Sequence, residues 1–426
     1  MEDKIIKIEN SFSQNFSVGW FLARRDIKHA NKWTTSLIIF VMTLTFLNLI
    51  VVSGILIGLI QGSEDAAKKY AIGDMIVSSF LNRSAIEQTP KVEEIVKTIP
   101  GYRDHTVRYT GAVTVSSNYR ETIRPGDKVD EMGAILMGID PTQEEKFSGI
   151  SKFVIRGEYL KDTDQDSILI GKNLLYEFTP IEAPGFQTLK NISIGQRVKI
   201  TVGNNSKEYF IKGILGSKVD EFDTSVVAVA SEVRKLTGRT DLNAGTIAIQ
   251  LLPGTDPVFA RDFLLKSGVG EYARVQTAEE AFPKFLKDIK ATFEILGTAI
   301  SGIGLVVASI TIFIVIFVNA ITSRRYIGIL KGIGINQKAI LYSYMYQAFI
   351  YASFGIIFGM MLIFFLIKPY FAAHPINFPF SDGILVATMS GSLFRAVVLL
   401  VTTIIAGYIP ARIVIKQNTL SAILGR

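Results

Sequence analysis

Few side chains in this 426-residue chain have the types and spacing that chemistry requires. There is no cysteine, and none of the three histidines, His29, His105 and His374, has a second ligand at metal-binding spacing. The alternating aspartates from Asp162 to Asp166 resemble a calcium loop, but glycine is missing at the sixth position and glutamate at the twelfth, which favours a solvated turn. There is no Gly-x-x-x-x-Gly-Lys-Ser/Thr phosphate-binding loop and no nucleophile–base signature. The sequence therefore predicts no catalytic residue, no metal site and no directly bound cofactor.

The stretch from Ser323 to Lys338 has the composition of a docking segment. It is rich in isoleucine and glycine and is bordered by arginine and lysine. A short helix of this kind can lay an apolar face into a groove on a partner while its cations meet acidic residues on the rim. A plain cationic loop would explain the charges but not the four apolar residues between Ile327 and Ile333. The candidate docking residues are Arg324, Arg325, Ile327, Gly328, Ile329, Leu330, Lys331, Gly332, Gly334 and Lys338.

Small and polar residues interrupt the apolar segments of the chain. Two pairs of glycines four residues apart allow helices to pack closely, either within one chain or at a dimer seam, and the sequence leaves both open. These pairs are Gly54 with Gly58 and Gly355 with Gly359. Three polar residues could line a substrate path, although interhelical hydrogen bonding or snorkelling is the commoner use. They are Asn48, Gln347 and Arg395.

Four segments, three of which hold these residues, are apolar enough to cross a bilayer, which takes roughly 20 residues. They are residues 34–60, 295–323, 339–367 and 391–411. Residues 61–294 carry 30 Lys+Arg and 33 Asp+Glu, which leaves 15 and 5 for the rest of the chain. Because the excess positive charge lies beside the apolar segments, it indicates orientation and contact with lipid headgroups rather than binding of nucleic acid.

The same charges predict the orientation of the chain. Residues 1–33, 324–338 and 412–426 are rich in lysine and arginine, so these segments and both termini are predicted to be cytoplasmic. Residues 368–390 and the large segment 61–294 are then predicted to lie outside the membrane on the other side.

Before the first span, four apolar residues recur at spacings of four, three and four. They are Phe16, Trp20, Ala23 and Ile27. With cations between them, this pattern predicts an amphipathic helix in the cytoplasmic interface, and a cationic flank that only enforces topology is the alternative.

The large segment alternates short apolar runs with helical patterns, which predicts an α+β domain with two subdomains. The predicted strands are 75–77, 112–115, 134–137, 168–170, 198–202, 209–214, 226–229 and 246–251, and the predicted helices are 91–98, 231–236 and 257–266. Residues 180–185 are a candidate hinge or exposed loop. We expect Thr277–Glu294 to form one charged helix that runs into the second span, and Ser63–Tyr70 to continue the first span in the same way, so that the two make a stalk.

This arrangement resembles the ABC transporter permeases of the MacB, LolC/LolE and FtsX type, over the whole chain. The segment from Ser323 to Lys338 is similar to the family's cytoplasmic coupling segment, with Tyr326 where the family commonly has glutamate. Met137-Gly-Ile-Asp-Pro141 resembles part of the MacB-like periplasmic domain. Ile409-Pro-Ala-Arg412 with residues 420–426 resembles the family's ending, with Asn418-Thr419 in place of Asp-Pro.

The resemblance implies a multi-pass permease of the inner membrane, an α-helical membrane protein with a large α+β extracytoplasmic domain between its first and second spans. Without a phosphate-binding loop, it implies a separate ABC ATPase, in two copies, that supplies ATP and Mg. It also implies a second permease copy or paralogue, contact with membrane lipid, and a periplasmic adaptor or lipoprotein carrier. The expected function is export or extraction of an amphipathic substrate such as a lipoprotein, peptide or drug. An FtsX-like regulator that activates a cell-wall hydrolase without transport is the alternative.

Overall fold

The computed structural model describes residues 12–119, 130–180, 187–190, 192–374, 376–378, 381–383 and 385–416. The chain divides into a helical unit, residues 1–59, 288–376 and 383–426, and a sheet unit, residues 60–287 and 377–382. The candidate hinge at 180–185, except Pro180, and the motif residues 418–426 lie outside the described residues.

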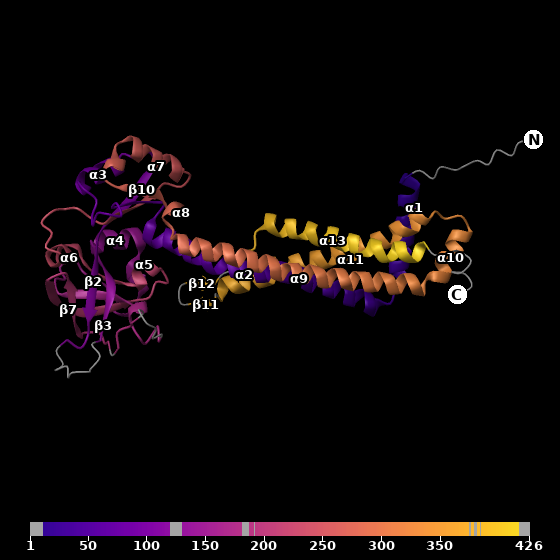
Figure 1. The fold of residues 1–426 in the computed structure, drawn as a ribbon, viewed down its shortest axis with the longest axis horizontal. Coiled ribbons are helices and arrows are strands. Elements are labelled where there is room, and N and C mark those ends of the chain that lie inside the picture. Colours follow the sequence, from indigo (N-terminus) through magenta and orange to yellow (C-terminus); the bar gives the residue numbers. More distant parts are fainter. Residues whose placement is uncertain are drawn as a thin grey trace, which may run out of the picture. The chain divides into compact units, whose positions relative to one another are not determined.

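The helical unit contains four helices among the described residues that are long and apolar enough to cross a membrane, which confirms the four predicted spans (Figure 1). They are built from α2 (Lys32–Ala66), α9 (Lys284–Thr322), α11 (Gln337–Leu362) and α13 (Met389–Ile415). Shorter helices flank them, namely α1 (Phe12–His29), α10 (Arg324–Gly332), the π-helical η5 (Ile363–Ile367) and α12 (Lys368–Ala373). A two-stranded sheet joins β11 (Ile376–Phe378) and β12 (Ser381–Gly383).

Most of these helices extend beyond the apolar windows that predict them. The first continues from α2 into the π-helical turn η1 (Ala67–Ile72), and the third continues through η5 into α12. The fourth passes Pro410 and ends at Ile415. A hydropathy window detects only the apolar part of a helix. The backbone hydrogen bonds of the helix continue into the polar residues at either end, as long as these residues keep helical dihedrals.

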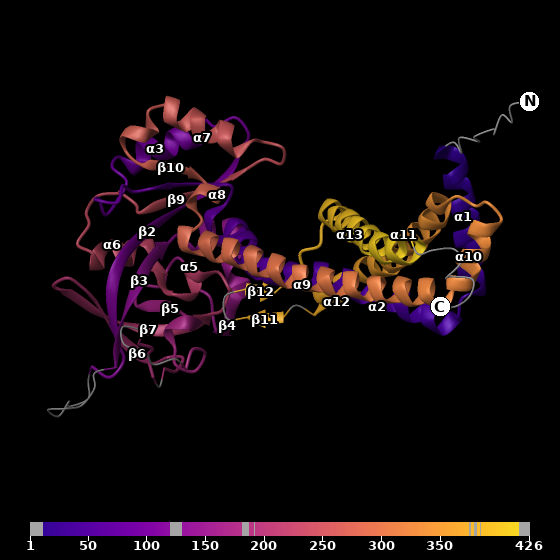
Figure 2. The same cartoon turned by 45° about the vertical axis from the view of Figure 1, so that its right-hand side comes forward.

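The sheet unit is built on a mixed ten-stranded sheet in the order β10-β1-β9-β2-β3-β8-β5-β7-β4, with β6 paired to β2 and β7 (Figure 2). The strands are β1 (Met75–Ser78), β2 (Tyr102–Ser116), β3 (Glu131–Ile139), β4 (Val154–Gly157), β5 (Ser167–Gly171), β6 (Arg197–Val202), β7 (Asn205–Leu215), β8 (Ser225–Val229), β9 (Thr246–Leu251) and β10 (Arg274–Thr277). All eight predicted strands are confirmed, whereas β4 and β10 are additional. Most pairs are antiparallel, but β3 with β8 and β5 with β7 are parallel.

Helices cover this sheet around separate hydrophobic cores. They are α3 (Thr89–Val96), α4 (Pro141–Ser148), α5 (Asp220–Asp223), α6 (Ala230–Leu236), α7 (Pro257–Lys266) and α8 (Ala278–Ala281), with 3-10 turns at η2 (Ile150–Phe153), η3 (Lys172–Leu174) and η4 (Val269–Glu271). One core packs α3 and α7 on β1 and β9, and another packs α6 on β3, β6, β7 and β8. The long strand β2 pairs with β9 in its first half and with β3 in its second, so it joins the two halves of the sheet.

The prediction of one continuous helix over Thr277–Glu294 is wrong. Thr277 ends β10 and caps the short helix α8 with a capping box that includes Glu280, and the chain then becomes extended at Phe282 before Pro283. Proline lacks an amide donor and disfavours helical dihedrals at the preceding residue, so α9 starts only at Lys284.

Candidate functional site

The helix α10 is the segment that the sequence singles out for docking, and its C-terminus is fixed by local sequence. The amide of Gly334 donates to Lys331 O (3.1 Å) and the amide of Ile335 to Leu330 O (3.0 Å), which is a Schellman motif. Gly334 has φ +92°, a conformation that glycine adopts without steric cost. Gly334 thus ends the helix and turns the chain toward α11.

Eight of the ten candidate docking residues lie on α10, whereas Gly334 lies in the turn that follows it and Lys338 lies in α11. Ile327 and Leu330 are buried in the core of the helical unit, at 3% and 8% exposure, and Gly328 is buried beside them. Of the ten candidates, Arg325, Ile329, Gly332, Gly334 and Lys338 are exposed, and the neighbouring Ile333 is exposed as well. Arg325, Ile329 and Ile333 follow one another at intervals of four, so they form one stripe along the helix. We call these three residues the α10 stripe.

The opposite side of α10 attaches the helix to its neighbours. Lys331 donates to the carbonyl of Ile415 at the end of α13, and burial lowers the pKa of this lysine. Tyr326, at the position where the resembling family has glutamate, lies under the guanidinium of Arg25 in α1, with Cζ 5.4 Å from the ring centroid. Nε of Arg324 is buried and has no hydrogen-bond partner among the described residues. The stripe is therefore presented by a helix that contacts both α1 and α13.

The helix α1 packs against α11 within the same unit. A Cβ built on Gly19 would lie 2.8 Å from Cβ of Tyr342. Asp26 accepts a hydrogen bond from Nε2 of Gln347 at 3.2 Å, and burial raises the pKa of this aspartate against the lowering effect of Arg25. Gln347 therefore forms an interhelical hydrogen bond.

The glycine pairs contact segments of the same chain. A Cβ on Gly355 would lie 2.4 Å from Cβ of Met42, and one on Gly359 would lie 2.5 Å from a ring carbon of Phe46. Gly54 approaches the carbonyl of Val386, and Gly58 is buried. The contacts of Gly355 and Gly359 describe packing of α11 on α2 within one chain, and the contact of Gly54 describes packing of α2 against the segment before α13.

The other polar residues at membrane depth differ in their contacts. Arg395 donates to Oγ of Ser53 at 3.1 Å. Oδ1 of Asn48 is buried without a hydrogen-bond partner among the described residues and faces the backbone of α9 at Gly304.

A buried ion cluster in the sheet unit was missed by sequence reasoning. Arg108 in β2 and Glu144 in α4 are both fully buried, with hydrogen bonds from Nη2 to Oε1 (2.7 Å) and from Nε to Oε2 (3.0 Å). Nη1 also donates to Glu221 (3.2 Å) and to the carbonyl of Ala71 in η1 (2.6 Å). Burial alone would lower the pKa of Arg108, but Glu144 and Glu221 raise it above its ordinary value.

The alternation of inward-facing and outward-facing residues along β2 contained a sign of this cluster. Thr106 and Arg108 share one face of the strand, and Thr106 donates to the same carboxylate, Glu144, at 2.9 Å. A charged residue on the inward face of a central strand requires a buried partner, but the sequence does not say which acid supplies it.

The remaining chemistry candidates form local contacts. His105 lies beside Tyr102 and Glu93, and His374 stacks on Tyr370. Asp162 accepts from Thr142, and Asp164 and Asp166 pair with Lys212 and Lys207. Among the described residues, no group of three or more histidines and acids is placed to hold a metal ion.

Comparison with known proteins finds a family match for part of the helical unit. Residues 298–419 match the family described as FtsX-like permease C-terminal. The macrolide export ATP-binding/permease proteins MacB of two Campylobacter jejuni strains are 24% identical over 292 residues, which cover 65% of this chain and 43% of each relative. The chain thus spans less than half the length of the curated relatives that it matches.

Solved structures are also similar to part of the chain. The periplasmic region of MacB from Actinobacillus actinomycetemcomitans has a TM-score of 0.33 at 14% identity, covering 49% of this chain and 91% of that one. The extracellular domain of the noncanonic ABC-type transporter YknZ from Gram-positive bacteria has a TM-score of 0.30 at 13% identity, covering 48% of this chain and 97% of that one.

Proposed function

We propose that this chain is an FtsX-like permease and that it couples ATP hydrolysis by a separate ATPase to movement of its sheet unit. The family match over residues 298–419 and the similarity to MacB support this proposal. In this function, ATP-driven closure of two ATPase subunits on the cytoplasmic side pushes on α10. The sheet unit, on the opposite side of the membrane, then acts on an amphipathic substrate such as a lipoprotein, a peptide or a drug. A second copy of the chain or a paralogue completes the permease.

The α10 stripe carries this proposal. Ile329 is 47% exposed and Ile333 71% exposed, although α10 lies outside the four apolar spans. Apolar side chains rimmed by Arg325 and Lys338 suit an apolar groove with an acidic rim on a partner. Because the other face of α10 is held by Ile327, Leu330 and Lys331, a push on the stripe would move the helix together with its neighbours.

The buried ion cluster suits the other end of this mechanism. The π-helical turn η1 continues the first span helix, and its Ala71 carbonyl is held by Arg108. Arg108 in turn holds α4 through Glu144 and α5 through Glu221. A displacement of η1 would then be passed to β2, α4 and α5 together, because a charge network in a low-dielectric interior resists being broken. In this proposal, Arg108 positions η1, α4 and α5 relative to β2, so that a movement of η1 reaches the sheet.

The test is affinity purification of the tagged full chain from its native membranes, with mass spectrometry and ATP turnover of the purified sample. We expect an ATP-hydrolysing subunit to accompany the wild type and to be lost from Ile329→Asp, which places a carboxylate on the stripe. The matched control is Ile155→Asp, because Ile155 is 45% exposed on β4 of the sheet unit and should leave ATPase association unchanged. An unchanged complex and unchanged turnover in Ile329→Asp would refute the coupling role of α10.

A further inference from the structure

A cavity of about 340 Å³ lies where α1 turns into α2, and nothing in the proposed function uses it. Its lining comes from the end of α1, the connecting turn, the first two turns of α2 and one residue of α11. The residues are Ile27, Lys28, Ala30, Lys32, Thr35, Ser36, Ile39 and Phe358. We call it the α1–α2 pocket.

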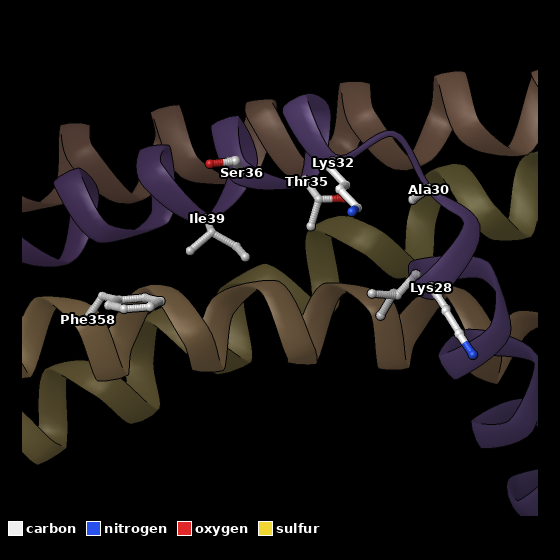
Figure 3. Close-up of a pocket in the computed structure, with 8 residues that line it drawn as sticks. Lys28, Ala30, Lys32, Thr35, Ser36, Ile39 and Phe358 are labelled. Atoms are coloured by element: carbon white, nitrogen blue, oxygen red, sulfur yellow. The ribbon is translucent and has the colours of Figure 1, made fainter.

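The α1–α2 pocket has a polar end and an apolar end (Figure 3). Lys32 and Thr35 lie together at the polar end, and Lys28 extends from α1 away from Ile39 and Phe358. Ile39 and Phe358 face each other across the other end, from α2 and α11. The lining therefore changes from cationic and hydroxyl groups to apolar side chains along the direction of α2.

The two lysines lack acidic partners. Neither Lys28 nor Lys32 forms a salt bridge within the described part of the chain, and both are exposed. The only acidic residue between Phe12 and Thr35 is Asp26, which instead binds Gln347. An anion placed between the lysines would therefore gain two charge-assisted interactions and displace no internal ion pair.

The position of the pocket along the helix matches the level of lipid headgroups. Lys32 begins the first span, and the apolar run of α2 follows it. Trp33, beside it, is 86% exposed, as expected for a tryptophan anchored at the membrane–water interface. Next to the lining residues in sequence, α2 and α11 expose Leu37, Phe40 and Ile357 at 57–62%. An occupant would thus continue from the polar end directly along surfaces that face acyl chains.

We infer that the α1–α2 pocket binds an anionic glycerophospholipid of the leaflet on the α1 side. Its phosphate lies between Lys28 and Lys32 and accepts from the hydroxyls of Thr35 and Ser36, and its acyl chain passes between Ile39 and Phe358. Pockets for ligands measure about 300–1,000 Å³, so 340 Å³ holds a phosphate with its glycerol and the first methylenes, while the rest of the lipid follows the outer helix surface. Basic pockets between helices on the cytoplasmic side are established sites for anionic headgroups.

This lipid would join three helices. Lys28 belongs to α1, Lys32 and Ile39 to α2, and Phe358 to α11, so the bound lipid fastens the turn between α1 and α2 to α11. The inference stands without the proposed ATPase, because it depends only on the pocket and its place beside the first span.

The test is native mass spectrometry of the purified full chain in neutral detergent, titrated with phosphatidylglycerol or phosphatidylcholine. We expect one retained phosphatidylglycerol, at least tenfold preferred over phosphatidylcholine. The variant Lys28→Gln/Lys32→Gln should weaken its retention roughly 30-fold, about five- to sixfold for each lysine near the headgroups. The matched control Arg24→Gln/Arg412→Gln removes two exposed charges at the same end of the helical unit but outside the pocket, and it should retain the lipid.

A cavity-filling variant separates a built site from a diffuse cationic surface. Ser36→Phe keeps both lysines and fills the pocket, so it should also lose the retained phosphatidylglycerol. Equal loss in the Arg24→Gln/Arg412→Gln control, or full retention in Ser36→Phe, would overturn the pocket as the site. Displacement of the lipid by millimolar inorganic phosphate would overturn the assignment to a lipid.

Discussion

Removal of the Arg108 guanidinium is the sharpest test of the buried ion cluster. In the variant Arg108→Met, the fully buried carboxylate of Glu144 loses two hydrogen bonds and its compensating charge, and the carbonyl of Ala71 loses its donor. Breaking a buried pair by removing one partner costs about 3–5 kcal/mol. Since 1.4 kcal/mol is a factor of ten, the population of opened sheet unit should rise by roughly two to three and a half orders of magnitude.

The assay is hydrogen exchange of the full chain in detergent, read by mass spectrometry on peptides from β2, β3 and α4. Tryptophan fluorescence serves as an internal control, because both tryptophans, Trp20 and Trp33, belong to the helical unit and should report no change. The exposed pair of Arg156 with Glu177 provides the matched variant Arg156→Met, which should leave exchange unaltered.

The double variant Arg108→Met/Glu144→Leu identifies the cause of the loss. An apolar replacement of both partners removes the uncompensated charge, so protection in β2 should recover at least tenfold over Arg108→Met alone. A less than tenfold loss of exchange protection in Arg108→Met, or no recovery of protection in the double variant, would refute the view that the buried pair of Arg108 and Glu144 stabilises the sheet unit.

Three further predictions concern other parts of the molecule. Gly355→Val places methyl groups against Met42 and should destabilise the helical unit by about 1–3 kcal/mol in thermal unfolding, whereas Gly302→Val, where a Cβ meets no atom within 4 Å, should not. Burial raises the pKa of Glu232, but hydrogen bonds from Lys207 and Lys235 lower it below its ordinary value of 4.5, so its contribution is present above that pH and is lost as the pH falls through the lowered pKa. When the pH is lowered, hydrogen exchange in the sheet unit should therefore speed up less in Glu232→Gln than in the wild type. An equal increase in the two proteins would contradict this. Gly334→Ala forces a positive φ on alanine, which should fray the end of α10 and reduce ATP turnover of the purified complex. Unchanged hydrogen exchange at α10 would argue against a role for Gly334 in ending the helix.

Several features of the fold could be predicted because their signals are local. The four spans follow from apolar length, and the eight confirmed strands follow from alternating or compact apolar runs. The error over Thr277–Glu294 was also local. Thr277 and Glu280 have the spacing of a capping box, and Pro283 ends what precedes it, so the sequence contained both the start of α8 and the break before α9.

The sequence by itself determined which segments are apolar enough to enter lipid, where the sheet unit is inserted, and that the segment after Ser323 is both cationic and apolar. Only the tertiary structure decided that Ile327 and Leu330 are buried while Ile329 is exposed, that Gly355 packs on Met42, and that Arg108 selects Glu144. The physical reason is the distance along the chain over which each signal acts. Hydropathy and alternation act over a few neighbouring residues, whereas these contacts join residues far apart along the chain, and packing alone determines which partners meet.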